Sequence, residues 1–93
     1  MAWYFLRVSD CETDESLAAF RFKAKAIGRI HSSGKGTEID PTAGWVVIAI
    51  SQNEVPGVRE RLREYGLSER VDHIEPLAKP RDGAAIARQL ALF

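Results

Sequence analysis

The chain has 93 residues and a mass of 10.4 kDa, which is enough for one domain with its own core but not for two. Apolar residues make up 45% and charged residues 28%, a composition typical of globular proteins that excludes a wholly disordered or collagen-like chain. Thirteen Lys and Arg residues balance thirteen Asp and Glu residues, so no overall positive charge draws the protein to nucleic acid. Any such contact must come from a local basic patch.

The chain contains one cysteine, Cys11, and two histidines, His31 and His73, which allow neither an internal disulfide nor a zinc finger. We therefore expect a reducing compartment. We also expect no cofactor and no bound metal. The first ten residues lack the long apolar run and the cleavage site of a signal peptide, and no stretch approaches membrane-spanning length. The sequence thus predicts a cytoplasmic protein that does not contact membranes.

The amino-terminal part predicts a strand followed by a helix. Residues 2–9 are mostly aromatic or branched, which favours a strand. Thr13 is then followed by two acidic residues and by apolar residues at helical spacing as far as Gly28, so we expect a helix between these two positions. Residues 20–26 also alternate strictly between polar and apolar, and a half-buried strand is the alternative there.

The middle of the chain predicts a loop and then the clearest strand. Residues 31–44 contain turn-forming residues throughout, which indicates a long exposed loop. Residues 45–51 are apolar on both faces, as expected for a central strand. A short strand over residues 29–32 could pair with it as a hairpin.

A second helix is predicted with both of its ends specified. Asn53 is expected to cap it, with Pro56 in its first turn. Gly66 is placed to end it in the left-handed conformation, and Leu67 could cover Leu62 as in a Schellman ending. Its apolar face comprises Val55, Val58, Leu62 and Tyr65.

The last predicted strand completes a known order of elements. Residues 71–77 predict a strand that the proline within it places at a sheet edge. The order strand, helix, strand, strand, helix, strand is that of a ferredoxin-like sandwich, an α+β fold with both helices on one face of an antiparallel sheet. We expect this domain over residues 1–78, and a linker with a carboxyl-terminal tail or short helix over residues 79–93.

Acidic residues gather after the first strand. Asp10 ends that strand, and Glu12, Asp14 and Glu15 follow, a set of carboxylates that could hold a divalent cation. Asp10 at this position resembles the aspartate of the small CRISPR-adaptation nucleases and their toxin relatives, which are ferredoxin-like proteins. That resemblance implies a metal-dependent nuclease or toxin. Acids at the start of a helix also favour its dipole, and we prefer this structural interpretation.

Three other residues are chemically capable of catalysis. Cys11 could act as a nucleophile, and His31 and His73 could exchange protons. Their spacing matches no motif with a known mechanism, and a lone cysteine near a strand end is more often a small apolar residue. The sequence therefore predicts no catalytic residue.

A basic stretch lies beside two phenylalanines, Phe20 and Phe22. Such a stretch could contact the phosphates of nucleic acid, although a solvated helix face is the simpler interpretation. The basic residues proposed for this contact are Lys23, Lys25, Arg29 and Lys35.

The last five residues, QLALF, carry the most specific motif in the chain. They resemble the QLxLF peptide with which bacterial polymerases, mismatch-repair proteins and other replication factors dock on the DNA sliding clamp. The resemblance rests on Gln89, Leu90, Leu92 and Phe93, with Ala91 at the variable position. It implies a bacterial or phage binding protein, not an enzyme, that acts in replication, repair or their inhibition.

The same segment has a second interpretation. Ile86, Leu90 and Phe93 fall at positions i, i+4 and i+7, so the segment could be a helix that packs its apolar stripe on the open face of the sheet. The protein would then be a dimerising interaction module whose carboxyl-terminal helix belongs to the core.

Overall fold

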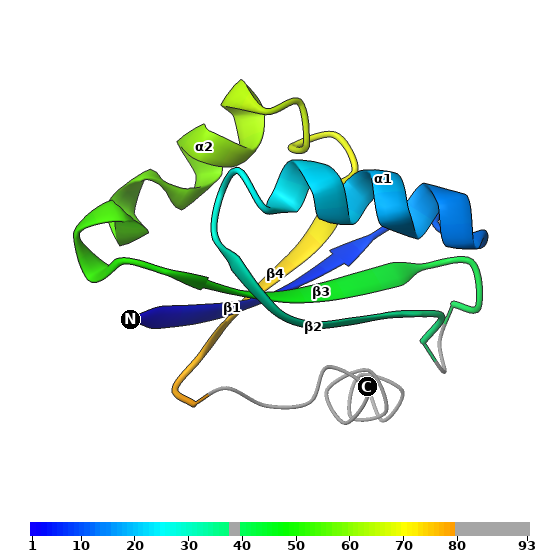
Figure 1. The fold of residues 1–93 in the computed structure, drawn as a ribbon, viewed down its shortest axis with the longest axis horizontal. Helices are drawn as coiled ribbons and strands as arrows, with labels where there is room; N and C mark the ends of the chain where they lie inside the picture. Colours follow the sequence, from blue (N-terminus) through cyan, green and yellow to red (C-terminus); the bar gives the residue numbers. More distant parts are fainter. Residues whose placement is uncertain (38–39, 80–93) are drawn as a thin grey trace.

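Residues 1–37 and 40–79 are described by the computed structural model, in which a four-stranded antiparallel sheet carries two helices on one face (Figure 1). The strands lie in the order β2-β3-β1-β4, and every neighbouring pair is antiparallel. They are β1 (Ala2–Val8), β2 (Arg29–Lys35), β3 (Gly44–Ile50) and β4 (Val71–Leu77). The order of the elements and of the strands confirms the predicted α+β, ferredoxin-like sandwich.

Helix α1 (Asp14–Ala24) connects β1 to β2 and begins as predicted. The Thr13 side chain accepts a hydrogen bond of 3.0 Å from the Ser16 N–H, which satisfies one of the free donors of the first turn. Phe20 is fully buried whereas Phe22 is 79% exposed, so the alternative of a strand over residues 20–26 is wrong.

Helix α1 ends four residues before Gly28, where the sequence placed its end. After Ala24 the backbone forms hydrogen bonds between residues three apart in a tighter turn. This turn brings Gly28 against β3. A Cβ atom at Gly28 would lie only 2.5 Å from the Ala49 carbonyl oxygen. Glycine is therefore needed for a close approach of two backbones at the start of β2.

The long loop predicted over residues 31–44 is wrong in its first part, because residues 31–35 belong to strand β2. These residues pair with β3, with an irregularity of register between Ile30 and Ser32. The Trp45 side chain lies over Gly34, where a Cβ atom would be 2.5 Å from the indole ring. A residue typical of turns is thus used here to make room for an aromatic ring across the sheet.

Helix α2 (Val58–Glu64) begins later than predicted. Residues Gln52–Gly57 form a 3₁₀ helix, η1, and Gly57 rather than Asn53 precedes the regular helix. Because proline disfavours the α-helical conformation in the residue before it, the regular helix starts only after Pro56.

The end of α2 matches the predicted Schellman motif. Gly66 has a φ of 70°, and the N–H groups of Leu67 and Gly66 donate to the carbonyl oxygens of Leu62 and Arg63 at 2.8 and 3.0 Å. Leu62 and Leu67 are buried, as expected. Tyr65 is 42% exposed, so its assignment to the apolar face is wrong; it follows the last helical residue, and Leu67 takes its place in the core.

The helices and the sheet enclose the main core. It contains side chains from β1, β3 and both helices, including Leu6, Ile48, Phe20 and Leu62. Neither helix in the described part of the chain is long and apolar enough to cross a bilayer.

Candidate functional site

The predicted clamp-binding residues Gln89, Leu90, Leu92 and Phe93 lie outside the described residues, as does the rest of residues 80–93. Their role stays a prediction from the sequence. The described chain ends at Lys79, two residues beyond β4, so the candidate peptide follows an edge strand of the sheet.

The acidic residues after β1 do not form a metal site among the residues that the structure describes. Asp10 is exposed and has a φ of 53°, and its backbone carbonyl accepts a long hydrogen bond from Arg70. Asp14 instead forms an ion pair with Lys35. No group of three His, Cys, Asp or Glu side chains that could hold a metal ion occurs in this part of the chain.

Cys11, His31 and His73 are kept apart by the fold. Cys11 is buried in the main core, and burial raises the pKa of its thiol. His31 and His73 lie on β2 and β4, the two opposite edges of the sheet, which three strand spacings place about 14 Å apart. The three residues therefore do not share one catalytic site.

The basic residues form a groove between α1 and β2, here called the α1–β2 groove. Its volume is about 590 Å³. It is lined by Arg21, Lys25, Gly28, Arg29, Ile30, His31, Ser32 and Ser33. The structure thus brings together two of the four predicted basic residues, Lys25 and Arg29, and adds Arg21 and His31.

The other two predicted basic residues do not line this groove. Lys23 lies on the exposed part of α1, and Lys35 is held by its ion pair with Asp14. Arg21 was missed by the sequence analysis, although it lies four residues before Lys25 and hence on the same face of the helix.

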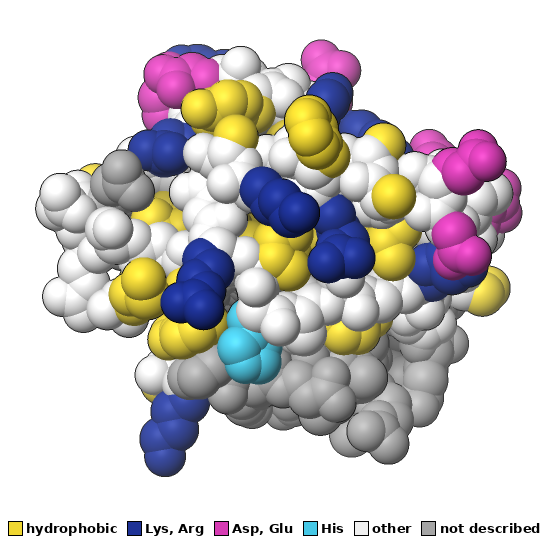
Figure 2. Space-filling view, in the orientation of Figure 1, with side chains coloured by type: hydrophobic (Ala, Val, Ile, Leu, Met, Phe, Trp, Pro, Cys, Tyr) yellow, Lys and Arg dark blue, Asp and Glu magenta, His cyan; other side chains and the backbone are white. Residues whose placement is uncertain are grey.

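Charge is segregated on this side of the molecule even though the chain is neutral overall. Lys and Arg side chains gather over α1 and β2 in the middle of the view, and Asp and Glu side chains lie toward its margins (Figure 2). No described acidic residue lines the α1–β2 groove. The groove could therefore accept an anionic group such as a phosphate.

The sheet face opposite the helices carries a second apolar cluster, here called the aromatic face. It comprises Trp3, Phe5, Trp45, Val47 and Leu77. The Phe5 and Trp45 rings stack with their centroids 6.3 Å apart, and Trp3 meets the His31 ring edge-on at 5.3 Å. These residues come from β1, β3 and β4, and they meet because the strand register places them side by side.

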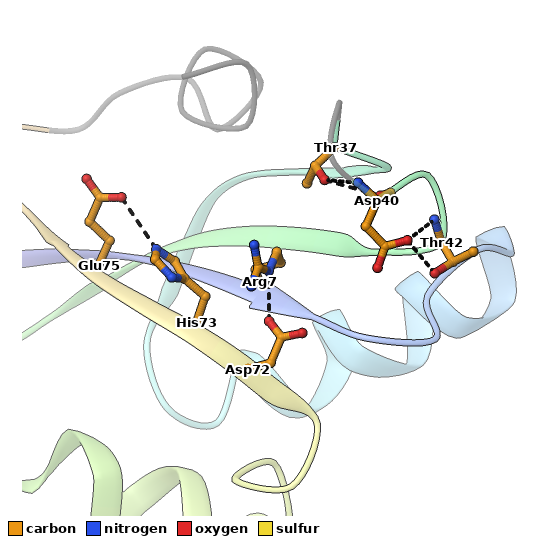
Figure 3. A network of polar contacts seen from close by, with 7 residues as sticks. All are labelled: Arg7, Thr37, Asp40, Thr42, Asp72, His73 and Glu75. Carbon is orange, nitrogen blue, oxygen red and sulfur yellow. Dashed lines mark hydrogen bonds and ion pairs between the residues drawn. The ribbon is translucent and has the colours of Figure 1, made fainter. Parts of the chain in front are cut away.

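Polar residues border the aromatic face along β1 and β4. Arg7 Nε donates a 2.8 Å hydrogen bond to Asp72 Oδ1, and His73 Nε2 lies 3.6 Å from Glu75 Oε2 (Figure 3). The His73 ring also meets the Phe5 ring edge-on at 6.1 Å. This border joins the edge strand β4 to the centre of the sheet.

No protein-family model matches the chain, and no curated protein matches it at a significant level.

Proposed function

We propose that this is a small binding protein that docks on the bacterial DNA sliding clamp through its carboxyl-terminal peptide, in the cytoplasm, and acts in replication, repair or their inhibition. The observation that carries the proposal is the QLALF sequence. Its four specified residues recur by chance on the order of once in 10⁵ positions at ordinary residue frequencies. They are Gln89, Leu90, Leu92 and Phe93.

The described part of the chain contains a core built from its helices and strands. Among the described residues, the main core draws its side chains from between Tyr4 and Ile74, in both helices and all four strands.

Docking is expected to follow the chemistry of short apolar peptides. Leu90, Leu92 and Phe93 would occupy an apolar pocket, and Gln89 would form hydrogen bonds at its rim and fix the register. Three anchors with few hydrogen bonds imply a dissociation constant of roughly micromolar size.

The proposal is tested by titrating a purified bacterial sliding clamp with the full chain and its variants. Leu92→Ala and Phe93→Ala should each weaken binding by about 30-fold, because each removes an anchor worth about 2 kcal/mol. Ala91→Ser, at the variable position, is the control and should bind within about twofold of the natural chain. Absence of binding at tens of micromolar, or equal losses in all three variants, would contradict the proposal.

We also propose that the α1–β2 groove contacts the phosphates of DNA. Three cationic side chains, Arg21, Lys25 and Arg29, line it without a described acid among them. Two serines on β2 add hydroxyl groups that can donate hydrogen bonds to phosphate oxygens.

This second proposal predicts a binding loss that depends on position. The double variant Lys25→Glu, Arg29→Glu should bind a fluorescent DNA oligonucleotide at least about tenfold more weakly at low salt. The slope of the logarithm of the binding constant against the logarithm of the salt concentration should become less steep by about two. The double variant Arg59→Glu, Arg63→Glu on α2 makes the same change in net charge away from the groove. Equal losses in both would show that only net charge matters.

A further inference from the structure

A second hollow adjoins the α1–β2 groove at the start of β2. Its volume is about 360 Å³, within the range of sites that hold small organic groups. It is here called the Trp3 hollow, and it is lined by Met1, Trp3, Arg29, Ile30 and His31. The last three of these residues also line the α1–β2 groove, so the two hollows meet along the first residues of β2.

The strand register explains why a cation and an indole ring border the same hollow. Arg29 and Trp3 both pair with Ala49 of β3, from opposite sides, so the three residues form one row across the sheet. Side chains in such a row project from the same face, and Arg29 and Trp3 lie two strand spacings apart, about 10 Å. Because Ala49 has only a methyl group, the row leaves space between the guanidinium group and the indole ring.

His31 adds a second aromatic ring to the Trp3 hollow. The irregularity of register between Ile30 and Ser32 leaves His31 without a paired residue in β3. Its ring meets the Trp3 ring at an angle of 86°, and its Nδ1 atom lies 3.3 Å from Ser32 Oγ. The His31 side chain is exposed, so these two contacts orient a ring that solvent can reach.

The two hollows differ in chemistry in the same way as the two parts of a nucleotide. The α1–β2 groove offers the cations of Arg21 and Lys25 and the hydroxyl groups of two serines, which suit an anionic phosphate. The Trp3 hollow offers flat aromatic rings, on which a nucleobase can stack. Arg29 borders both, and no described acidic residue lines either of them.

We propose that the two hollows together bind single-stranded DNA, with a phosphate in the α1–β2 groove and a neighbouring base stacked in the Trp3 hollow. This binding mode deepens the proposed phosphate contact of the groove and rests on it. In duplex DNA the base faces are stacked on one another, and only the phosphates and the edges of the bases are accessible. A site that joins cations to aromatic rings therefore selects a single strand, with little preference for sequence.

The contribution of the bases is measured with two strands that differ only in having them. A fluorescent oligothymidylate of about ten nucleotides carries the same phosphates as an abasic strand of equal length. The natural chain should bind the oligothymidylate at least about tenfold more tightly, because only this strand can stack. Equal affinities for the two strands would overturn the proposal.

Variants of the two rings locate the stacked base. Trp3→Leu and His31→Ala should each weaken binding of the oligothymidylate by about tenfold. Binding of the abasic strand and of a hairpin duplex should stay within about twofold, because both lack an accessible base face. His31 is exposed, so His31→Ala tests the proposal even if Trp3→Leu does not fold.

Phe22→Leu is the matched control for these variants. Phe22 is 79% exposed on α1 and lines neither hollow, although it lies next to the basic residues in the sequence. Its replacement should leave binding of the oligothymidylate within about twofold. A loss in Phe22→Leu that equals or exceeds the loss in His31→Ala would place the base elsewhere and refute the Trp3 hollow as its site.

The salt dependence separates this proposal from the phosphate contact on which it rests. Trp3→Leu removes no charge and should leave the slope of the logarithm of the binding constant against the logarithm of the salt concentration unchanged. The double variant Arg21→Ala, Lys25→Ala removes two cations that line only the groove. It should make that slope less steep by about 1.4 for both strands.

The two proposals can therefore fail separately. If only the double variant weakens binding, the phosphate contact stands and the stacked base is wrong. If only Trp3→Leu and His31→Ala weaken binding, the stacked base stands and the phosphate contact is wrong. If the natural chain binds neither strand at low salt, both are wrong.

Tryptophan fluorescence reports the stacking without a binding curve. The chain has two tryptophans, Trp3 and Trp45, so Trp45→Phe leaves Trp3 as the single reporter. A base stacked on an indole ring quenches its emission, and saturating oligothymidylate should quench this variant whereas the abasic strand should not. In Trp3→Leu the emission of Trp45 should stay constant. Absence of quenching in Trp45→Phe would contradict a base stacked on Trp3.

Discussion

Phe20→Ala is expected to lower the free energy of unfolding by about 3 to 5 kcal/mol, because it removes a large side chain from the main core and leaves a cavity between α1 and the sheet. Phe20 is fully buried there. Phe22→Ala is the matched control, since the same side chain is 79% exposed two residues later, and should change stability by less than about 0.5 kcal/mol. Urea unfolding followed by circular dichroism measures both values.

The comparison of these two variants also decides between helix and strand at this segment. In a strand, Phe20 and Phe22 would point to the same face and would contribute alike. In a helix they point about 200° apart. Equal losses of stability would therefore contradict α1 as the structure has it.

The features predicted correctly are those specified by neighbouring residues. Strand β4 has the predicted bounds, and β1 and β3 are within one residue of theirs. Thr13 and Gly66 specify the start of α1 and the end of α2, because a cap needs only a hydroxyl group or a left-handed residue at one position.

The wrongly predicted loop depends on residues far apart in the sequence, whereas the start of α2 was misjudged locally. Residues 31–35 form a strand because β3 offers them hydrogen-bond partners. Gly34 leaves room for the side chain of Trp45, which lies eleven residues later in the sequence. Local composition alone indicates turns at these positions. The late start of α2 reflects a 3₁₀ helix that the pattern around Pro56 did not distinguish from a regular first turn.

The candidate surfaces, too, could be predicted only where residues close in the sequence form them. Proximity in the sequence identified Lys25 and Arg29, but the ion pair of Lys35 with Asp14 across the β2 end could not be foreseen from it. The aromatic face was also hidden, because its residues alternate with core residues along β1 and β3. Only the register, which places Phe5 opposite Val47, brings them into one surface.

Cys11 is expected to resist alkylation in the native protein. Its side chain is fully buried, its N–H donates a 2.7 Å hydrogen bond to the Thr42 carbonyl oxygen, and Gly44 packs closely against its sulfur atom. The thiolate is the reactive form, and burial raises the pKa of this thiol, so both access and ionisation are reduced. Reaction with iodoacetamide at neutral pH should be at least about 100-fold slower than in urea-unfolded protein, because it requires local or global opening.

The raised pKa of the Cys11 thiol also gives the sign of a pH effect on stability. Below the pKa of the unfolded thiol, near 8.5, the thiol is neutral in both states and the free energy of unfolding does not depend on it. Above that pH the unfolded state loses the proton more readily than the native state, so stability falls as the pH rises toward the native pKa. Cys11→Ala should remove this part of the alkaline loss. Rapid alkylation of a folded chain at neutral pH would instead place the thiol at the surface and contradict the packing of Cys11 against Gly44.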